Sequence, residues 1–282
     1  MLPQELFFGI TMYDILFAAG VVSALVTFRV MSDKIGMSAK MLNFVLADGV
    51  VSILVGVFSA VLFQAIYNYQ KTGVFELTAN TGMTFYGGFI GGAVTFFAVY
   101  FGVGRIVFRD GENLRELSTV TSIGACCVAI AHCLGRLGCL CAGCCYGVHA
   151  KPPLGWFMPG VGDTVLPTQL YEAVFLAIMF ALLVRRTLKR GRYVLPIYLA
   201  AYGVWRFALE YIRGDERGNS LVSWLTPSQF TAICLVACGV VLFFVERRFG
   251  NAKNPDRGAD NDGDGDNDSD NNSDSGNDSE KA

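Results

Sequence analysis

Two arginines lie within otherwise apolar stretches of the sequence, each with other polar residues at helical spacing. Arg136 follows His132 by four residues, so the two would share one face of a helix. A second stripe with the same spacing consists of Tyr202, Arg206, Glu210 and Arg213. A guanidinium stays charged when desolvated, and its fork of donors fits phosphate oxygens. The two arginines therefore predict a phosphate site, and inside a membrane the available phosphate is a phospholipid headgroup.

The composition places these residues in a membrane protein. Of 282 residues, 53% are hydrophobic and 16% are charged, against roughly 25% charged in a soluble domain. The basic residues form short clusters between apolar runs and no basic face, which argues against nucleic-acid binding. We predict a membrane domain at 1–250, followed at 251–282 by an acidic tail with ten acidic and three basic residues. Such a tail is expected to be disordered.

Seven apolar stretches are long enough to cross a bilayer, which takes about 18 residues or more. They lie at about 8–30, 41–67, 85–108, 118–140, 167–186, 193–212 and 227–246. The connections on one side of these stretches, with the start of the tail, hold 15 Lys and Arg, against 4 on the other side. Because Lys and Arg are enriched in cytoplasmic connections, we predict an all-α integral membrane protein. It would have seven transmembrane helices, an outer N-terminus and a cytoplasmic C-terminus.

With this orientation, the unusual polar residues of five stretches fall in the outer half of the bilayer. A charged side chain within the hydrocarbon costs roughly 2.5–3.5 kcal/mol on insertion scales. The placement of four such residues at one level indicates a shared cavity; they are Arg136, Arg206, Glu172 and Glu210. The alternative is a set of structural ion pairs, such as Arg206 with Glu210, that lock the helices together.

The cysteines form a second candidate site. Seven of the nine fall between Cys126 and Cys145, and the last four form the pattern C-x-C-x-x-C-C from Cys139 onward. Three interpretations stay open for these four. The first is a metal site, which is disfavoured because the paired C-x-x-C arms of common zinc sites are missing. The second is a disulfide, which would suit an oxidising outer face. In the third, the cysteines are small residues at a glycine turn, with Cys144 or Cys139 as a nucleophile. We predict no metal and no cofactor.

Four segments resemble one known family. Residues 135–147, GRLGCLCAGCCYG, resemble the signature G-R-x-G-N-x-x-N-G-E-x-W/Y-G of prolipoprotein diacylglyceryl transferases. Residues 167–172, PTQLYE, resemble its H-P-S/T-Q-L-Y-E segment without the histidine. Residues 202–207, YGVWRF, with Glu210 and Arg213, and residues 85–91, FYGGFIG, resemble two further segments of the family. The resemblance covers about 85–229 in order and implies the same seven-span topology.

The resemblance implies an activity and a set of site residues. The family transfers the diacylglyceryl group of phosphatidylglycerol to the lipobox cysteine thiol of a secreted prolipoprotein, at the outer face of the cell membrane. We predict as catalytic residues Arg136, Arg206, Tyr86, His132 and Cys144. We predict as substrate-binding residues Gly88, Gly135, Gly138, Cys139, Gly143, Gly147, Gln169, Tyr171, Glu172, Tyr202 and Glu210.

The chain departs from the family pattern where a base would be expected. Tyr86 stands in place of a histidine, and Cys139, Ala142 and Cys144 replace two asparagines and a glutamate of the signature. A tyrosine with a pKa near 10 is a poor base at neutral pH, so His132 is a candidate replacement. The alternatives are a phospholipid-dependent transferase with another acceptor, or a thiol-redox or metal-binding membrane protein that uses the cysteines.

Overall fold

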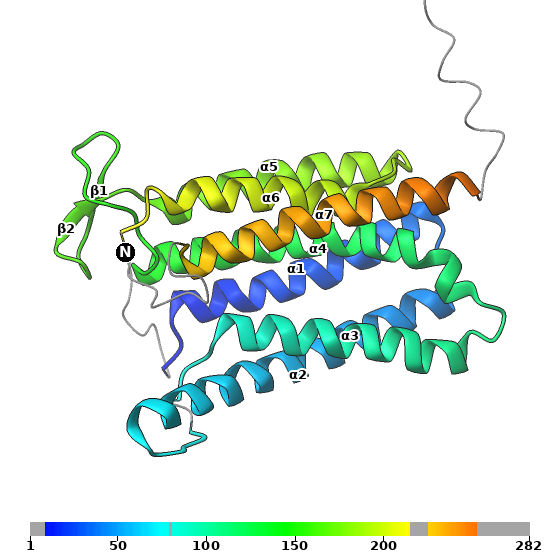
Figure 1. Cartoon of the computed structure of the whole chain (residues 1–282), viewed down its shortest axis with the longest axis horizontal. Coiled ribbons are helices and arrows are strands. Elements are labelled where there is room, and N and C mark those ends of the chain that lie inside the picture. Colours follow the sequence, from blue (N-terminus) through cyan, green and yellow to red (C-terminus); the bar gives the residue numbers. More distant parts are fainter. Residues whose placement is uncertain (1–8, 79–80, 215–224, 253–282) are drawn as a thin grey trace, which may run out of the picture.

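A computed structural model of the chain describes residues 9–78, 81–214 and 225–252. The predicted tail lies outside the described residues from 253 onward. Seven helices occur in the described ranges: α1 (Met12–Ile35), α2 (Ala39–Thr72), α3 (Phe85–Val107), α4 (Glu112–Ala142), α5 (Thr168–Leu188), α6 (Val194–Glu210) and α7 (Pro227–Ala252). They run side by side along one common direction (Figure 1). Each predicted apolar stretch is therefore confirmed as a helix.

Six of these helices are long and apolar enough to cross a membrane. The exception is α6, which has 17 residues, short of the roughly 20 that span the hydrocarbon core. It has the same direction as its long neighbours and packs most extensively on α7. The other large helix contacts pair α1 with α4, α2 with α3, and α4 with α5.

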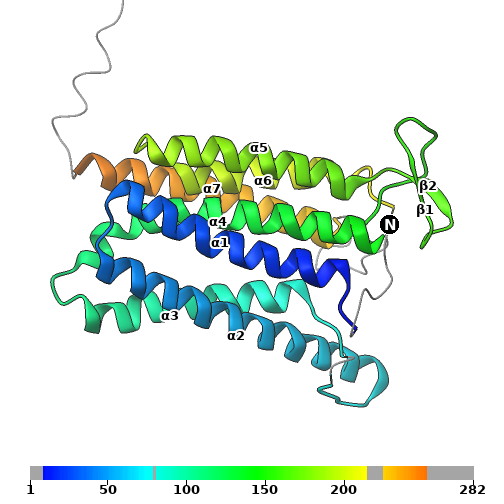
Figure 2. The same ribbon diagram turned by 180° about the vertical axis from the view of Figure 1, so that it is seen from behind.

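Two short strands depart from the predicted all-α fold. β1 (Trp156–Met158) and β2 (Asp163–Val165) pair antiparallel, with Trp156 opposite Val165. This hairpin lies at the end of the bundle where α4 ends and α5 begins, as the view from behind also shows (Figure 2). Strands of three residues are too short to produce a recognisable alternation of apolar and polar positions, so sequence periodicity did not reveal them.

Glycines allow α2 and α3 to approach closely, and Gly88 and Gly92 have the small-xxx-small spacing typical of such contacts. A Cβ added at Gly88 would lie 3.4 Å from the Gly56 carbonyl oxygen and 3.2 Å from the Ala60 Cβ. A Cβ at Gly91 would overlap the Cβ and Oγ of Ser59. The Gly88 contact also fixes the position of the first turn of α3, which carries Tyr86.

We expect Gly91→Ala to lower the free energy of unfolding by about 1–3 kcal/mol, because the added methyl group forces α2 and α3 apart. Gly102→Ala on the same helix is the matched control, since nothing lies within 4 Å of a Cβ at that position. Thermal unfolding in detergent measures both variants. Equal stability of the two would contradict the close packing of α2 on α3.

Candidate functional site

A buried carboxylate lies at the centre of the polar cluster. The Glu172 side chain, on the second turn of α5, is fully buried. Arg136 Nε on α4 is 2.9 Å from Glu172 Oε2, and the hydroxyl of Tyr202 on α6 donates to Glu172 Oε1 at 2.8 Å. Three helices thus converge on one ion pair. The structure thus brings together Arg136 and Glu172, two of the four residues predicted to share a cavity, and adds Tyr202.

His132 belongs to the same cluster. Its Nε2 accepts a hydrogen bond from Arg136 Nε at 3.2 Å, lies 3.7 Å from Glu172 Oε1, and its ring meets Tyr202 edge-on at 5.1 Å. A nitrogen that accepts from a guanidinium carries no proton of its own. The geometry therefore matches a histidine hydrogen-bonded within the bundle, which is an alternative to the predicted role as a base.

The second arginine is held by a different set of partners on α6 and α7. Arg206 is 6% exposed, and its Nη2 lies 2.8 Å from Glu210 Oε2 and 2.6 Å from Ser228 Oγ. Arg213 Nε is 3.9 Å from the same carboxylate oxygen, and Thr226 donates to the other oxygen at 2.9 Å. The anticipated ion pair of Arg206 with Glu210 is therefore present.

Both arginines keep donors that the described part of the chain does not use. Arg206 Nη1 is buried and has no hydrogen-bond partner among the described residues. The hydrogen bond and the ion pair of Arg136 both go through Nε, which leaves its two Nη nitrogens able to donate. A buried donor without a partner costs about 1–3 kcal/mol, so the site is better suited to an anionic ligand than to the empty state.

The turn after α4 is fixed to the start of α5. Gln169 Nε2 donates to the Cys144 carbonyl oxygen at 2.5 Å, and Thr168 Oγ1 donates to the Cys145 carbonyl oxygen at 2.8 Å. Gly143 adopts the left-handed conformation, with φ of 70°, that ends the helix. The turn therefore has one defined position relative to Arg136.

Several predicted glycines have packing roles. A Cβ at Gly147 would come within 2.8 Å of Leu166 Cβ and within 2.6 Å of the Ile212 carbonyl oxygen. A Cβ at Gly138 would come within 3.1 Å of the Tyr13 ring, and one at Gly135 would meet nothing within 4 Å. Gly147 thus allows the segment between α4 and β1 to pack against the residues that follow α6, a requirement that only the fold reveals.

Two further predicted residues, Tyr171 and Tyr86, are not among the described contacts of the polar cluster. The Tyr171 hydroxyl donates to the Leu154 carbonyl oxygen at 3.4 Å, so it points toward the hairpin and away from Glu172. The backbone of Tyr86 belongs to the first turn of α3, and its side chain lies outside the described part of the chain. Sequence reasoning missed Ser228 as a partner of Arg206, although its position beside Gln229 at the start of the last apolar stretch was a usable signal.

All nine cysteines lie in the described ranges, and none of them forms a disulfide. Contact with Cys139 lowers the pKa of the Cys144 thiol, but contact with Cys145 and partial burial raise it, and the net direction is upward. Since the thiolate is the nucleophilic form, this direction does not favour Cys144 as a nucleophile at neutral pH.

Comparisons with known proteins agree with these motifs. The family model of prolipoprotein diacylglyceryl transferase matches residues 4–245. The phosphatidylglycerol–prolipoprotein diacylglyceryl transferase of Clostridium tetani is 30% identical over 244 residues, covering 83% of this chain and 92% of that protein. A second such enzyme, from Clostridium perfringens, is 25% identical and covers 89% and 97%. One from Dehalococcoides mccartyi is 26% identical and covers 84% and 89%. This chain belongs to the prolipoprotein diacylglyceryl transferase family.

Proposed function

We propose that the protein transfers the diacylglyceryl group of phosphatidylglycerol to the lipobox cysteine thiol of secreted prolipoproteins. The observation that carries the proposal is a pair of arginines, the half-buried Arg136 and the buried Arg206. Arg206 Nη1 has no hydrogen-bond partner among the described residues, and the contacts of Arg136 with Glu172 and His132 both use Nε. The names of the protein's relatives supply the two substrates, phosphatidylglycerol and a prolipoprotein. The chemistry of the site supports a phosphodiester as one of these substrates.

In this proposal the two arginines hold the phosphate from neighbouring helices. Glu172 fixes Arg136 through Nε, and Glu210 with Ser228 fixes Arg206 through Nη2. Donors fixed in advance need no reorganisation when charge develops on a leaving group, which is where electrostatic catalysis gains most. Tyr202, which orients Glu172, would position the headgroup indirectly.

The reaction forms one bond and breaks one. The sulfur of the lipobox cysteine attacks the glyceryl carbon next to the phosphate, and the bond between that carbon and the phosphate oxygen breaks. The thiol proton leaves, the product is a thioether, and glycerol phosphate departs with the bonding electrons. Its phosphate gains negative charge, which Arg136 and Arg206 would stabilise.

An apolar groove beside the polar cluster suits the acyl chains of the lipid. It has a volume of about 490 Å³ and is lined by Phe175, Ala200, Ala201, Val204, Trp205 and Ala208. Trp205 stacks on Phe175 with ring centroids 4.5 Å apart, which gives the groove a rigid aromatic wall. Trp205 directly precedes Arg206, so headgroup and acyl chain would be held from the same turn of α6.

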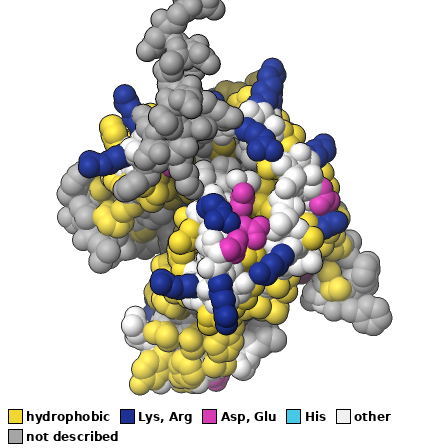
Figure 3. All heavy atoms as spheres, turned by 90° about the vertical axis from the view of Figure 1, so that its right-hand side faces the viewer, with side chains coloured by type: hydrophobic (Ala, Val, Ile, Leu, Met, Phe, Trp, Pro, Cys, Tyr) yellow, Lys and Arg dark blue, Asp and Glu magenta, His cyan; other side chains and the backbone are white. Residues whose placement is uncertain are grey.

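We further propose that the site faces the outer leaflet of the cell membrane, with α6 as a seventh span. The opposite end of the bundle carries many Lys and Arg side chains (Figure 3). This end contains the α1–α2, α3–α4 and α5–α6 connections and the end of α7. Enrichment of basic residues there supports a cytoplasmic position, and it supports an outer position for the hairpin.

An inserted epitope would test this orientation. We expect a short epitope placed after Gly160, an exposed residue of the hairpin turn, to bind antibody on intact spheroplasts. The same epitope after Asp110, an exposed residue between α3 and α4, would bind only after permeabilisation. Exposed loop tips tolerate such insertions. The reverse pattern would place the arginines at the inner leaflet and exclude exported preproteins as acceptors there.

The roles of Arg136 in folding and in transfer are separable. Arg136→Gln would leave Glu172 as an unpaired buried charge and lower stability by about 3–5 kcal/mol. Arg136→Gln combined with Glu172→Gln would recover most of that stability, while lipid transfer to a lipobox peptide stays at least about 100-fold below wild type. Thermal unfolding and a transfer assay measure the two effects.

The matched control for Arg136 is Arg115→Gln. Arg115 makes an exposed ion pair with Asp110, at 58% and 61% side-chain exposure, and such pairs contribute about 0–1 kcal/mol. This variant should keep both stability and transfer. Recovery of transfer in the Arg136→Gln/Glu172→Gln variant would mean that Arg136 is structural and would remove the phosphate argument.

His132→Gln distinguishes a base from a positioning residue. Glutamine can still accept the hydrogen bond from Arg136 Nε, so we expect transfer within about 10-fold of wild type and an unchanged pH–rate profile. Loss of a general base typically costs about 100- to 10,000-fold. A loss of that size, with the profile flattened near neutral pH, would identify His132 as the base.

A further inference from the structure

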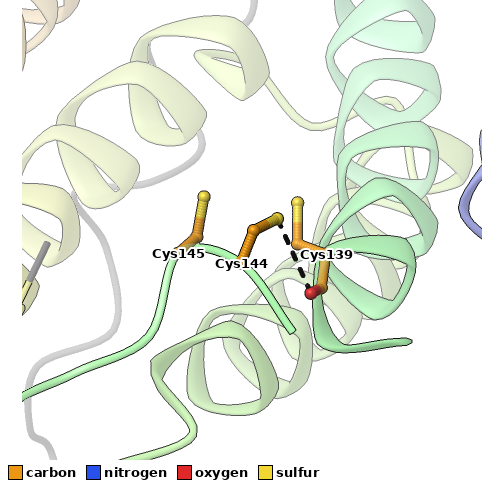
Figure 4. A group of neighbouring side chains, drawn as sticks. All are labelled: Cys139, Cys144 and Cys145. Atoms are coloured by element: carbon orange, nitrogen blue, oxygen red, sulfur yellow. Dashed lines mark hydrogen bonds between the residues drawn. The ribbon is translucent and has the colours of Figure 1, made fainter. Parts of the chain in front are cut away.

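Three thiols meet at the turn that follows α4. The sulfur atoms of Cys139, Cys144 and Cys145 all lie within 4.8 Å of one another. Their side chains stand next to each other with the sulfurs on the same side of the ribbon (Figure 4). Cys141, also in the C-x-C-x-x-C-C pattern, is not part of this group. The arrangement depends on the reversal of the chain at Gly143 and not on sequence spacing alone.

The backbone holds the three cysteines in this position. The Cys144 amide donates to the Cys139 carbonyl oxygen at 3.2 Å, which closes the turn. Cys145 has a φ of 65°, a conformation that costs a non-glycine residue of order 1–3 kcal/mol. Thr168 and Gln169 bind the carbonyl oxygens of Cys145 and Cys144. The sulfurs therefore converge because α5 fixes the turn, which is how a preformed ligand set is built.

The spacing of the sulfurs fits a zinc ion. Zinc–thiolate bonds of about 2.3 Å in tetrahedral geometry place the sulfurs about 3.8 Å apart. Movements of about 1 Å or less would bring the observed sulfurs to that separation. A disulfide needs sulfurs at about 2.05 Å and would join only two of the three. Soft thiolate ligands favour zinc over magnesium or calcium.

We propose that Cys139, Cys144 and Cys145 bind a zinc ion whose fourth position receives the acceptor thiol. Among the described residues, no fourth His, Cys, Asp or Glu joins the group. Zinc sites with three protein ligands and one open position are of the catalytic type, whereas structural sites are closed by four. Cys144 is exposed, so the open position is reachable by a substrate.

The role of the zinc rests on the proposed transfer. A thiol that coordinates zinc is deprotonated, so the lipobox thiol would displace zinc-bound water and release its proton to solvent. The zinc-bound sulfur then attacks the glyceryl carbon, and the carbon–oxygen bond to the phosphate breaks. The thioether product carries no charge on sulfur and is replaced by water. No redox partner is needed.

The position of the three cysteines relative to Arg136 is compatible with these reaction steps. Arg136 lies three residues before Cys139 on α4, so the two side chains are neighbours on one helix face. A thiolate at the zinc and a phosphate at Arg136 would thus be about one helical turn apart.

Metal content of the purified full chain in detergent tests the site. We expect about one zinc per wild-type chain, and none in Cys139→Ser/Cys144→Ser/Cys145→Ser. Cys234→Ser/Cys238→Ser is the matched control, since both residues are exposed cysteines of α7, and it should keep its zinc. Cobalt exchange should give a thiolate charge-transfer band in the wild type and the control only. Wild-type zinc no higher than in the triple variant would overturn the proposal.

Transfer to a lipobox peptide tests the role of the zinc. Removal of zinc by a chelator should lower transfer at least 100-fold, and added zinc should restore it. Full transfer by the stripped protein would overturn the zinc role and leave the proposed function standing. Stoichiometric zinc without transfer, in a phosphatidylglycerol vesicle with the peptide present, would instead overturn the proposed function and leave the metal site standing.

Discussion

The structure of the site depends on one buried ion pair, between Glu172 and Arg136. An unpaired carboxylate inside a membrane bundle would cost several kcal/mol, and Glu172 is fully buried. Its oxygens are met by Arg136 from α4 and by Tyr202 from α6. Because α5 carries the carboxylate, the pair fixes three helices at one level. The orientations of His132 and of the Arg136 guanidinium follow from this contact.

Backbone hydrogen bonds also fix the end of the bundle where this ion pair lies. Gly147 hydrogen-bonds to the Leu166 carbonyl oxygen at 2.8 Å, and the next amide, of Val148, donates to Ile212 at 2.9 Å. The segment between α4 and β1 is thereby joined both to the residue before the start of α5 and to the residues after the end of α6. Since Gln169 and Thr168 also anchor the cysteine turn, a small group of contacts determines where arginines and thiols lie relative to each other.

The sequence was sufficient for features with strong local signals. Apolar length located the helices, and the spacing of His132 with Arg136 correctly predicted a shared face that meets Glu172. It was insufficient where tertiary contacts decide. The three-residue strands carry no periodicity, and the spacing of the cysteines does not show that three of their sulfurs come within 4.8 Å of one another. The contact of Ser228 with Arg206 likewise arises only when α6 and α7 pack.

The charge balance of the site is matched to its proposed ligand. Among the described residues, Arg136, Arg206 and Arg213 face two carboxylates, Glu172 and Glu210. A phosphodiester carries one negative charge, which the arginines would neutralise in the proposed complex. As the carbon–oxygen bond breaks, the charge on the phosphate would grow beyond one, and the two arginines would then interact more strongly with it than with the bound lipid. Catalysis requires binding that becomes stronger as the transition state is approached. In the proposed site this condition requires carboxylates that hold the arginines without using all of the arginines' hydrogen-bond donors.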